Sequence, residues 1–80
     1  MNHRTRIKLC GLKRPIDVQA AAAAGADAIG LVFYPPSLRY VSATEAAKLL
    51  ECLPPFISSV GLFVNAEVEL VREIVAAAPI

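Results

Sequence analysis

The chain has 80 residues, of which 56% are hydrophobic, and its formal net charge is +1. A chain of this length forms at most one small domain, and a nearly balanced charge gives no electrostatic reason to expect a nucleic-acid partner. No run free of charged residues reaches the ~18 apolar residues that a membrane-spanning helix needs, so no membrane partner is expected either.

The apolar fraction exceeds the roughly 45–50% that is usual for soluble domains. Such an excess favours strands buried on both faces, or surfaces that other parts of a larger assembly cover. The polar, basic start of the chain is not followed by the apolar segment of a signal peptide. A cytoplasmic location is therefore expected.

The two cysteines, Cys10 and Cys52, are far apart and form no C-x-x-C pair. One disulfide would satisfy the count, but free thiols in a reducing compartment are favoured. No glycine-rich phosphate loop and no His/Cys cluster with metal-ligand spacing is present, so neither a cofactor nor a metal is expected. His3 lies in the polar lead-in and is expected to be solvated.

The first half of the chain alternates strand and helix signals. Residues 7–10 predict a strand in which Lys8 and Cys10 share one face. Pro15 suits the first position of a helix, and Gly25 suits the position just beyond its end. Residues 28–33 form a continuous apolar run, which is typical of a strand covered on both faces.

The second half continues this alternation after a proline-stiffened loop, residues 34–40. Ser42 and Glu45 form an S-x-x-E capping box, which predicts a helix over residues 43–53. An apolar run at 57–64 predicts a third strand. Asn65 is expected to cap a third helix, residues 66–78, whose buried stripe would be Leu70, Val71, Ile74 and Val75.

Three consecutive βα units with right-handed crossovers predict an α/β fold with parallel strands. A parallel sheet needs both faces covered, whereas three strands with helices on one side leave a face and two edges bare. We therefore expect these 80 residues to be part of a larger fold.

Cys10 is the candidate reactive group, because a thiol at the carboxyl end of a strand lies where α/β folds build their sites. The alternative is a small buried hydrophobic residue, as most free cysteines are. Cys52, late in the second predicted helix, is expected to pack in the hydrophobic core. Gly11 and Gly61 are expected to allow close approach of neighbouring atoms rather than to bind phosphate.

Arg39 is the candidate binding residue, because it closes the loop that follows the second strand. A guanidinium there can hold a planar carboxylate through two hydrogen bonds. The alternatives are a solvated arginine or an ion pair with Asp27.

Four segments, KLCGL at 8–12, GADAIGLVF at 25–33, SLRYV at 37–41 and VGLFVN at 60–65, occur in a fixed order and spacing. Together they closely resemble the N-terminal part of the phosphoribosylanthranilate isomerase family. One departure is Lys13, where the family often has a threonine that caps the first helix.

The resemblance implies that residues 1–80 are the N-terminal βαβαβα fragment of a single TIM (β/α)8 barrel domain. The implied enzyme of tryptophan biosynthesis is an aldose–ketose isomerase that uses no cofactor or metal. It converts N-(5′-phosphoribosyl)anthranilate to 1-(2-carboxyphenylamino)-1-deoxyribulose 5-phosphate by an Amadori rearrangement. The fragment could be a truncation, a proteolytic product or one part of a split enzyme, able to pair with itself or with the missing barrel portion.

Within this resemblance Cys10 corresponds to the general base and Arg39 to a residue that binds near the anthranilate moiety. A base that takes the proton from ribose C2 contributes about 10²–10⁴-fold to rate, and a thiolate suits this role where positive charge favours its ionised form. We expect Lys8, on the same face, to supply part of that charge. The general acid and the phosphate ligands lie outside these residues, so the chain alone is expected to be inactive.

Two alternatives remain open. Another phosphosugar barrel enzyme, such as indole-glycerol-phosphate synthase, could share similar early strands, but it is not expected to carry the Lys-x-Cys-Gly start. A non-catalytic fragment that self-associates through exposed strand edges is the alternative of a different class.

Overall fold

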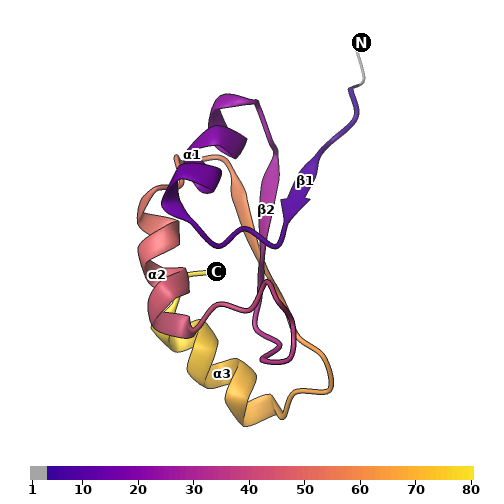
Figure 1. The fold of residues 1–80 in the computed structure, drawn as a ribbon, viewed down its shortest axis with the longest axis vertical. Coiled ribbons are helices and arrows are strands. Elements are labelled where there is room, and N and C mark those ends of the chain that lie inside the picture. The colour runs from indigo at the N-terminus through magenta and orange to yellow at the C-terminus, as the bar shows by residue number, and fades with distance from the viewer. Residues whose placement is uncertain (1–3) are drawn as a thin grey trace.

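A computed structural model describes residues 4–80, so the expectation for His3 lies outside the described residues. The elements in chain order are β1 (Lys8–Cys10), α1 (Pro15–Ala23), β2 (Ala28–Val32), α2 (Ala43–Glu51), β3 (Ser58–Leu62) and α3 (Val68–Ala77). The three strands form one parallel sheet in the order β1-β2-β3 (Figure 1). The predicted α/β arrangement of three βα units is thus confirmed. Within residues 4–80, no helix is long and apolar enough to span a membrane.

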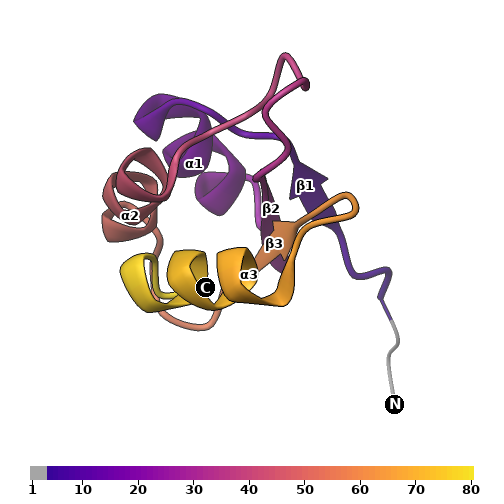
Figure 2. The ribbon, with the colours of Figure 1, turned by 90° about the horizontal axis from the view of Figure 1, so that it is seen from below.

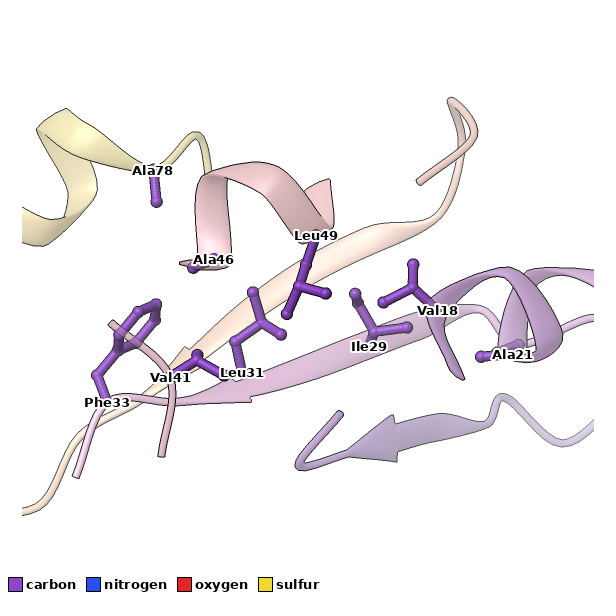
Figure 3. Close-up of a cluster of buried hydrophobic side chains, with 10 residues drawn as sticks. Val18, Ala21, Ile29, Leu31, Phe33, Val41, Ala46, Leu49 and Ala78 are labelled. Atoms are coloured by element: carbon purple, nitrogen blue, oxygen red, sulfur yellow. The ribbon is translucent and has the colours of Figure 1, made fainter. Parts of the chain in front are cut away.

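The helices α1, α2 and α3 all lie on one face of the sheet (Figure 2). Side chains of Ile29, Leu31 and Phe33 alternate along β2 and its continuation and point into this layer (Figure 3). Ile29 and Leu31 are fully buried, and burial of side chains of this size stabilises the fold by about 1.5–3 kcal/mol each. The other buried core residues are Val18, Ala21, Ala26, Val41, Ala46, Leu49 and Ala78.

The opposite face of the sheet carries the side chains that alternate with this core. Lys8 and Cys10 of β1 are exposed there, and Val60 of β3 keeps 36% of its accessible area. β1 and β3 pair only with β2, so each leaves one edge unpaired within residues 4–80. The bare face and the two bare edges expected from the sequence are therefore present in the described part of the chain.

The ends of α1 and α2 follow the sequence signals. Gly25 has a φ of +88° directly after the C-cap of α1, a conformation that costs glycine little. At α2 the Ser42 hydroxyl accepts from the Glu45 N–H (3.1 Å), and the Glu45 carboxylate accepts from the Ser42 N–H (2.9 Å). α2 ends two residues before the predicted limit, because Cys52 and Leu53 donate to carbonyls three residues back and tighten the last turn.

The prediction for the third helix was wrong at its start and over part of its stripe. Asn65 does not cap it: its φ is +51°, and α3 begins at Val68 with Glu67 as N-cap and no side-chain cap. Leu70 and Val75 are 42% and 49% exposed, whereas Val71 and Ile74 are half-buried. α3 is the last helix in the row (Figure 2), so only one flank of its apolar stripe meets the core.

β2 and β3 are shorter than the apolar runs that predicted them: β2 ends at Val32, although the Phe33 N–H still donates to the Leu62 carbonyl (2.9 Å), and β3 ends at Leu62. The rings of Phe33 and Phe63 stack with centroids 5.3 Å apart. A Cβ atom at Gly61 would lie 3.1 Å from Ile80 and 3.2 Å from Phe63, which confirms the expected close approach at this glycine.

Candidate active site

Cys10 is the last residue of β1 and lies at the carboxyl edge of the sheet, opposite Gly30 of β2. Cys10 is a free cysteine and is exposed, within residues 4–80, on the face that the helices do not cover. Cys52 is also a free thiol, and it packs half-buried against the core at the end of α2, as predicted.

Gly30 makes room for this thiol. A Cβ atom at Gly30 would lie 2.5 Å from the Cys10 Sγ atom and 3.0 Å from a methyl group of Leu62. The thiol therefore rests directly over the backbone of β2, and this contact limits the directions in which it can point. Sequence reasoning missed Gly30, although a lone glycine within an apolar strand is a known signal of close approach.

Gly11 follows Cys10 and brings the second candidate residue beside it. Its N–H donates to the Gly30 carbonyl (2.9 Å), which continues the β1–β2 ladder, and its φ is +80°. The Arg39 side chain crosses Gly11 so closely that a Cβ atom there would overlap the Arg39 Cδ atom. The expected close approach at Gly11 is confirmed, and Arg39 thus lies against the residue that directly follows Cys10.

The loop between β2 and α2 fixes the backbone of Arg39 on both sides. The Arg39 N–H donates to the Ser37 hydroxyl (3.0 Å), and the Tyr40 N–H donates to the Ser37 carbonyl (3.1 Å). The Val41 N–H then donates to the Val32 carbonyl (3.0 Å), which ties the loop back to the end of β2. Ser37 thus holds the turn from which the guanidinium extends.

A surface hollow of about 510 Å³ lies between the loops that follow β1 and β2. Arg14 and Asp17 pair at its wall through bonds of 2.9 and 3.0 Å, and hydrogen bonds from Arg14 lower the pKa of Asp17. The side chain of Arg39 makes no hydrogen bond or ion pair with any residue from 4 to 80, so its charge remains available for an anionic ligand. The lining residues are Gly11, Lys13, Arg14, Asp17, Leu38 and Arg39.

Asp27 lies at the other end of β2, so the alternative of an ion pair between Arg39 and Asp27 is wrong. Its carboxylate accepts from the Arg4 guanidinium (2.9 Å) and from the Ile7 N–H (2.8 Å). These bonds, with that from Arg4 foremost, lower the pKa of Asp27 to about 2. Lys8 lines a second hollow at this end, and its expected contribution of positive charge near Cys10 stays a prediction.

A sequence profile described as N-(5'phosphoribosyl)anthranilate (PRA) isomerase matches residues 7–80. The N-(5'-phosphoribosyl)anthranilate isomerase of Herminiimonas arsenicoxydans is 63% identical over 76 residues, which make up 95% of this chain and 34% of the relative.

Solved structures agree with the sequence comparisons. The crystal structure of phosphoribosyl anthranilate isomerase from Thermotoga maritima superposes with a TM-score of 0.89 at 40% identity, over 92% of this chain and 36% of that chain. A crystal structure of such an isomerase in complex with reduced 1-(o-carboxyphenylamino)-1-deoxyribulose 5-phosphate gives the same TM-score and identity, over 92% and 38% of the two chains. The chain thus spans about a third of the length of the relatives it matches.

Proposed function

The chain belongs to the N-(5'-phosphoribosyl)anthranilate isomerase family, and from this membership we propose that residues 1–80 form the N-terminal portion of a single (β/α)8 barrel domain with that activity. The reaction is the Amadori rearrangement of N-(5'-phosphoribosyl)anthranilate to the 1-deoxyribulose product in tryptophan biosynthesis. The observation that carries the proposal is that the Arg39 side chain lies against Gly11, the residue that directly follows Cys10.

Cys10 is the general base in this proposal. After the ribose ring opens to an iminium, the Cys10 thiolate takes the proton from C2, and the electron pair of that C–H bond forms the enamine double bond. The π pair of the C=N bond moves to nitrogen in the same step. Tautomerisation, in which C1 gains a proton and the C2 hydroxyl loses one, then gives the ketone. The position of Cys10 at the carboxyl end of β1 supports this role, because α/β folds build their sites at that end of the sheet.

Arg39 holds the carboxylate of the anthranilate moiety. Its planar guanidinium offers paired N–H donors, which match the two oxygens of an aromatic carboxylate. The relative solved with reduced 1-(o-carboxyphenylamino)-1-deoxyribulose 5-phosphate binds a ligand that has such a carboxylate and a phosphate group. The general acid and the phosphate ligands come from other parts of the barrel, so residues 1–80 alone are inactive, and no cofactor or metal takes part.

A chimeric barrel tests this function. In it, residues 1–80 replace the matching part of the Herminiimonas arsenicoxydans relative. Cys10→Ala should leave the urea midpoint unchanged and lower kcat by about 10²–10⁴-fold, because it removes a base. Cys52→Ala is the matched control, since it removes a thiol that only packs against the core. Near-normal turnover of Cys10→Ala would contradict the role of Cys10, and an inactive parent chimaera would contradict the function.

A second candidate function is self-association without catalysis, favoured by the unpaired edges of β1 and β3. Strand edges with free N–H and C=O groups pair readily with another chain. Concentration-dependent oligomers that bind no product analogue would support this candidate. The isomerase proposal places the protein in the cytoplasm, where a reducing environment keeps the thiol of Cys10 free.

A further inference from the structure

We propose that Lys13 is a positioning residue that fixes Arg39 by holding together the two loops on which the site is built. Lys13 lies in the loop after β1, and Leu38 and Arg39 lie in the loop after β2. This inference rests on the proposed function, because it assigns a role in binding the same substrate.

The contact that carries the inference runs from the Lys13 ammonium to the Leu38 carbonyl, at 3.2 Å. Within residues 4–80 it is the only side-chain hydrogen bond that joins these two loops. Leu38 directly precedes Arg39, and Lys13 is two residues beyond Gly11, the glycine that the Arg39 side chain crosses. The bond therefore sets the spacing of the two loops beside the point where Arg39 passes between them.

Apolar packing at the tip of the second loop does not replace this bond. The Leu38 side chain is 93% exposed, so the tip of its loop has no apolar anchor. The other bonds of this loop, made by Ser37 and Val41, are internal or return to β2. Of the side-chain hydrogen bonds of this loop within residues 4–80, only that from Lys13 reaches it from the loop after β1.

The charge of Lys13 fits this position. Hydrogen bonds from the Ser42 backbone and hydroxyl lower the pKa of Glu45 most, and the positive charges of Lys13 and Lys48 lower it further. The Lys13 ammonium thus donates to the Leu38 carbonyl, and its charge also favours the ionised form of Glu45 at the start of α2. The carbonyl dipole of Leu38 and the negative charge of Glu45 both attract this cation of the first loop.

The chimeric barrel tests the inference with Lys13→Met, which keeps the apolar stem and removes the donor. We expect weaker binding of reduced 1-(o-carboxyphenylamino)-1-deoxyribulose 5-phosphate, by about 3- to 10-fold in Kd, as for loss of one solvent-exposed charged hydrogen bond. KM should rise similarly while kcat stays nearly constant, because Cys10 is untouched. Lys13→Arg keeps a donor and should restore most of the affinity. Lys48→Met removes the other cation near Glu45 and should leave Kd unchanged.

A double-mutant cycle with Arg39→Met separates positioning from direct contact. If Lys13 acts through Arg39, Lys13→Met should cost almost nothing in the Arg39→Met background. An additive loss there would overturn the inference, and so would an unchanged Kd of the Lys13→Met single variant. In both cases an active parent chimaera leaves the proposed function standing, whereas an inactive parent refutes that function by itself.

Discussion

Gly30 shows how one missing side chain shapes the site. The Cys10 thiol occupies the space that a Cβ atom of residue 30 would fill, so the direction of the thiol depends on a residue of the neighbouring strand. The sheet register pairs these two residues, and no shift of the register would preserve the contact. The geometry of the site is thus set by backbone pairing as well as by the reactive residue itself.

Gly30→Ala should therefore lower kcat, although it adds only one methyl group. We expect kcat of the chimeric barrel to fall at least about 10-fold and stability to fall by about 1–3 kcal/mol, as for overpacking at a buried position. Gly25→Ala is the control: Gly25 has a positive φ with open space around it, so this change should cost stability without lowering kcat. Equal turnover in both variants would refute the importance of the contact.

Asp27 should make the stability of the folded protein depend on pH in the acid range. Its pKa falls from 3.8 to about 2 in the fold, so its bonds to Arg4 and Ile7 stabilise the protein above pH 3.8 and are lost as the pH falls towards 2. Asp27→Asn should lower the urea midpoint of the chimeric barrel at about pH 7, and the difference from the parent should shrink below about pH 4. A difference that stays constant between these pH values would contradict this linkage.

Among the elements, α2 should depend measurably on one hydroxyl, that of Ser42 in its capping box. Ser42→Ala removes the acceptor for the Glu45 N–H and should destabilise the chimeric barrel by about 0.5–2 kcal/mol, measured by urea unfolding. Thr44→Ala is the control, because Thr44 lies in the same first turn of α2 but is not part of the capping box. Similar losses in both variants would show that the cap is not responsible.

The elements were predictable where a local signal decides them. Pro15, Gly25 and the Ser42–Glu45 pair placed helix ends correctly, because capping is a contact between near neighbours in the chain. The start of α3 was not predictable from Asn65, because an asparagine suits both an N-cap and the left-handed conformation that it adopts here.

The site was predictable only in part, for the same reason. Cys10 and Arg39 were identified from their strand ends and from a family resemblance, and the structure places Arg39 against Gly11, the residue after Cys10. The contributions of Gly30 and Lys13 depend on which atoms lie across from them in space. No spacing in the sequence shows that the Lys13 ammonium meets the Leu38 carbonyl.

For the molecule as a whole, the uncovered sheet face indicates which partner the chain should bind. Val60 and the two strand edges need a covering partner, and the remaining portion of a barrel provides one. Native mass spectrometry of the chain mixed with the remaining part of the Herminiimonas arsenicoxydans relative should detect a one-to-one complex. Only homo-oligomers of the 80-residue chain in that mixture would favour the self-association candidate instead.

The order of strands in the sheet equals their order along the chain. Lys8 pairs with Ala28, and Ala28 pairs with Ser58. Each strand therefore pairs with the strand that was synthesised just before it. Contacts of such short sequence separation form early, and domains emerge N-terminus first during synthesis. Protease protection of arrested nascent chains would reveal this order. The Cys10 thiol would then lie over Gly30 as soon as β1 and β2 pair, while translation is still under way.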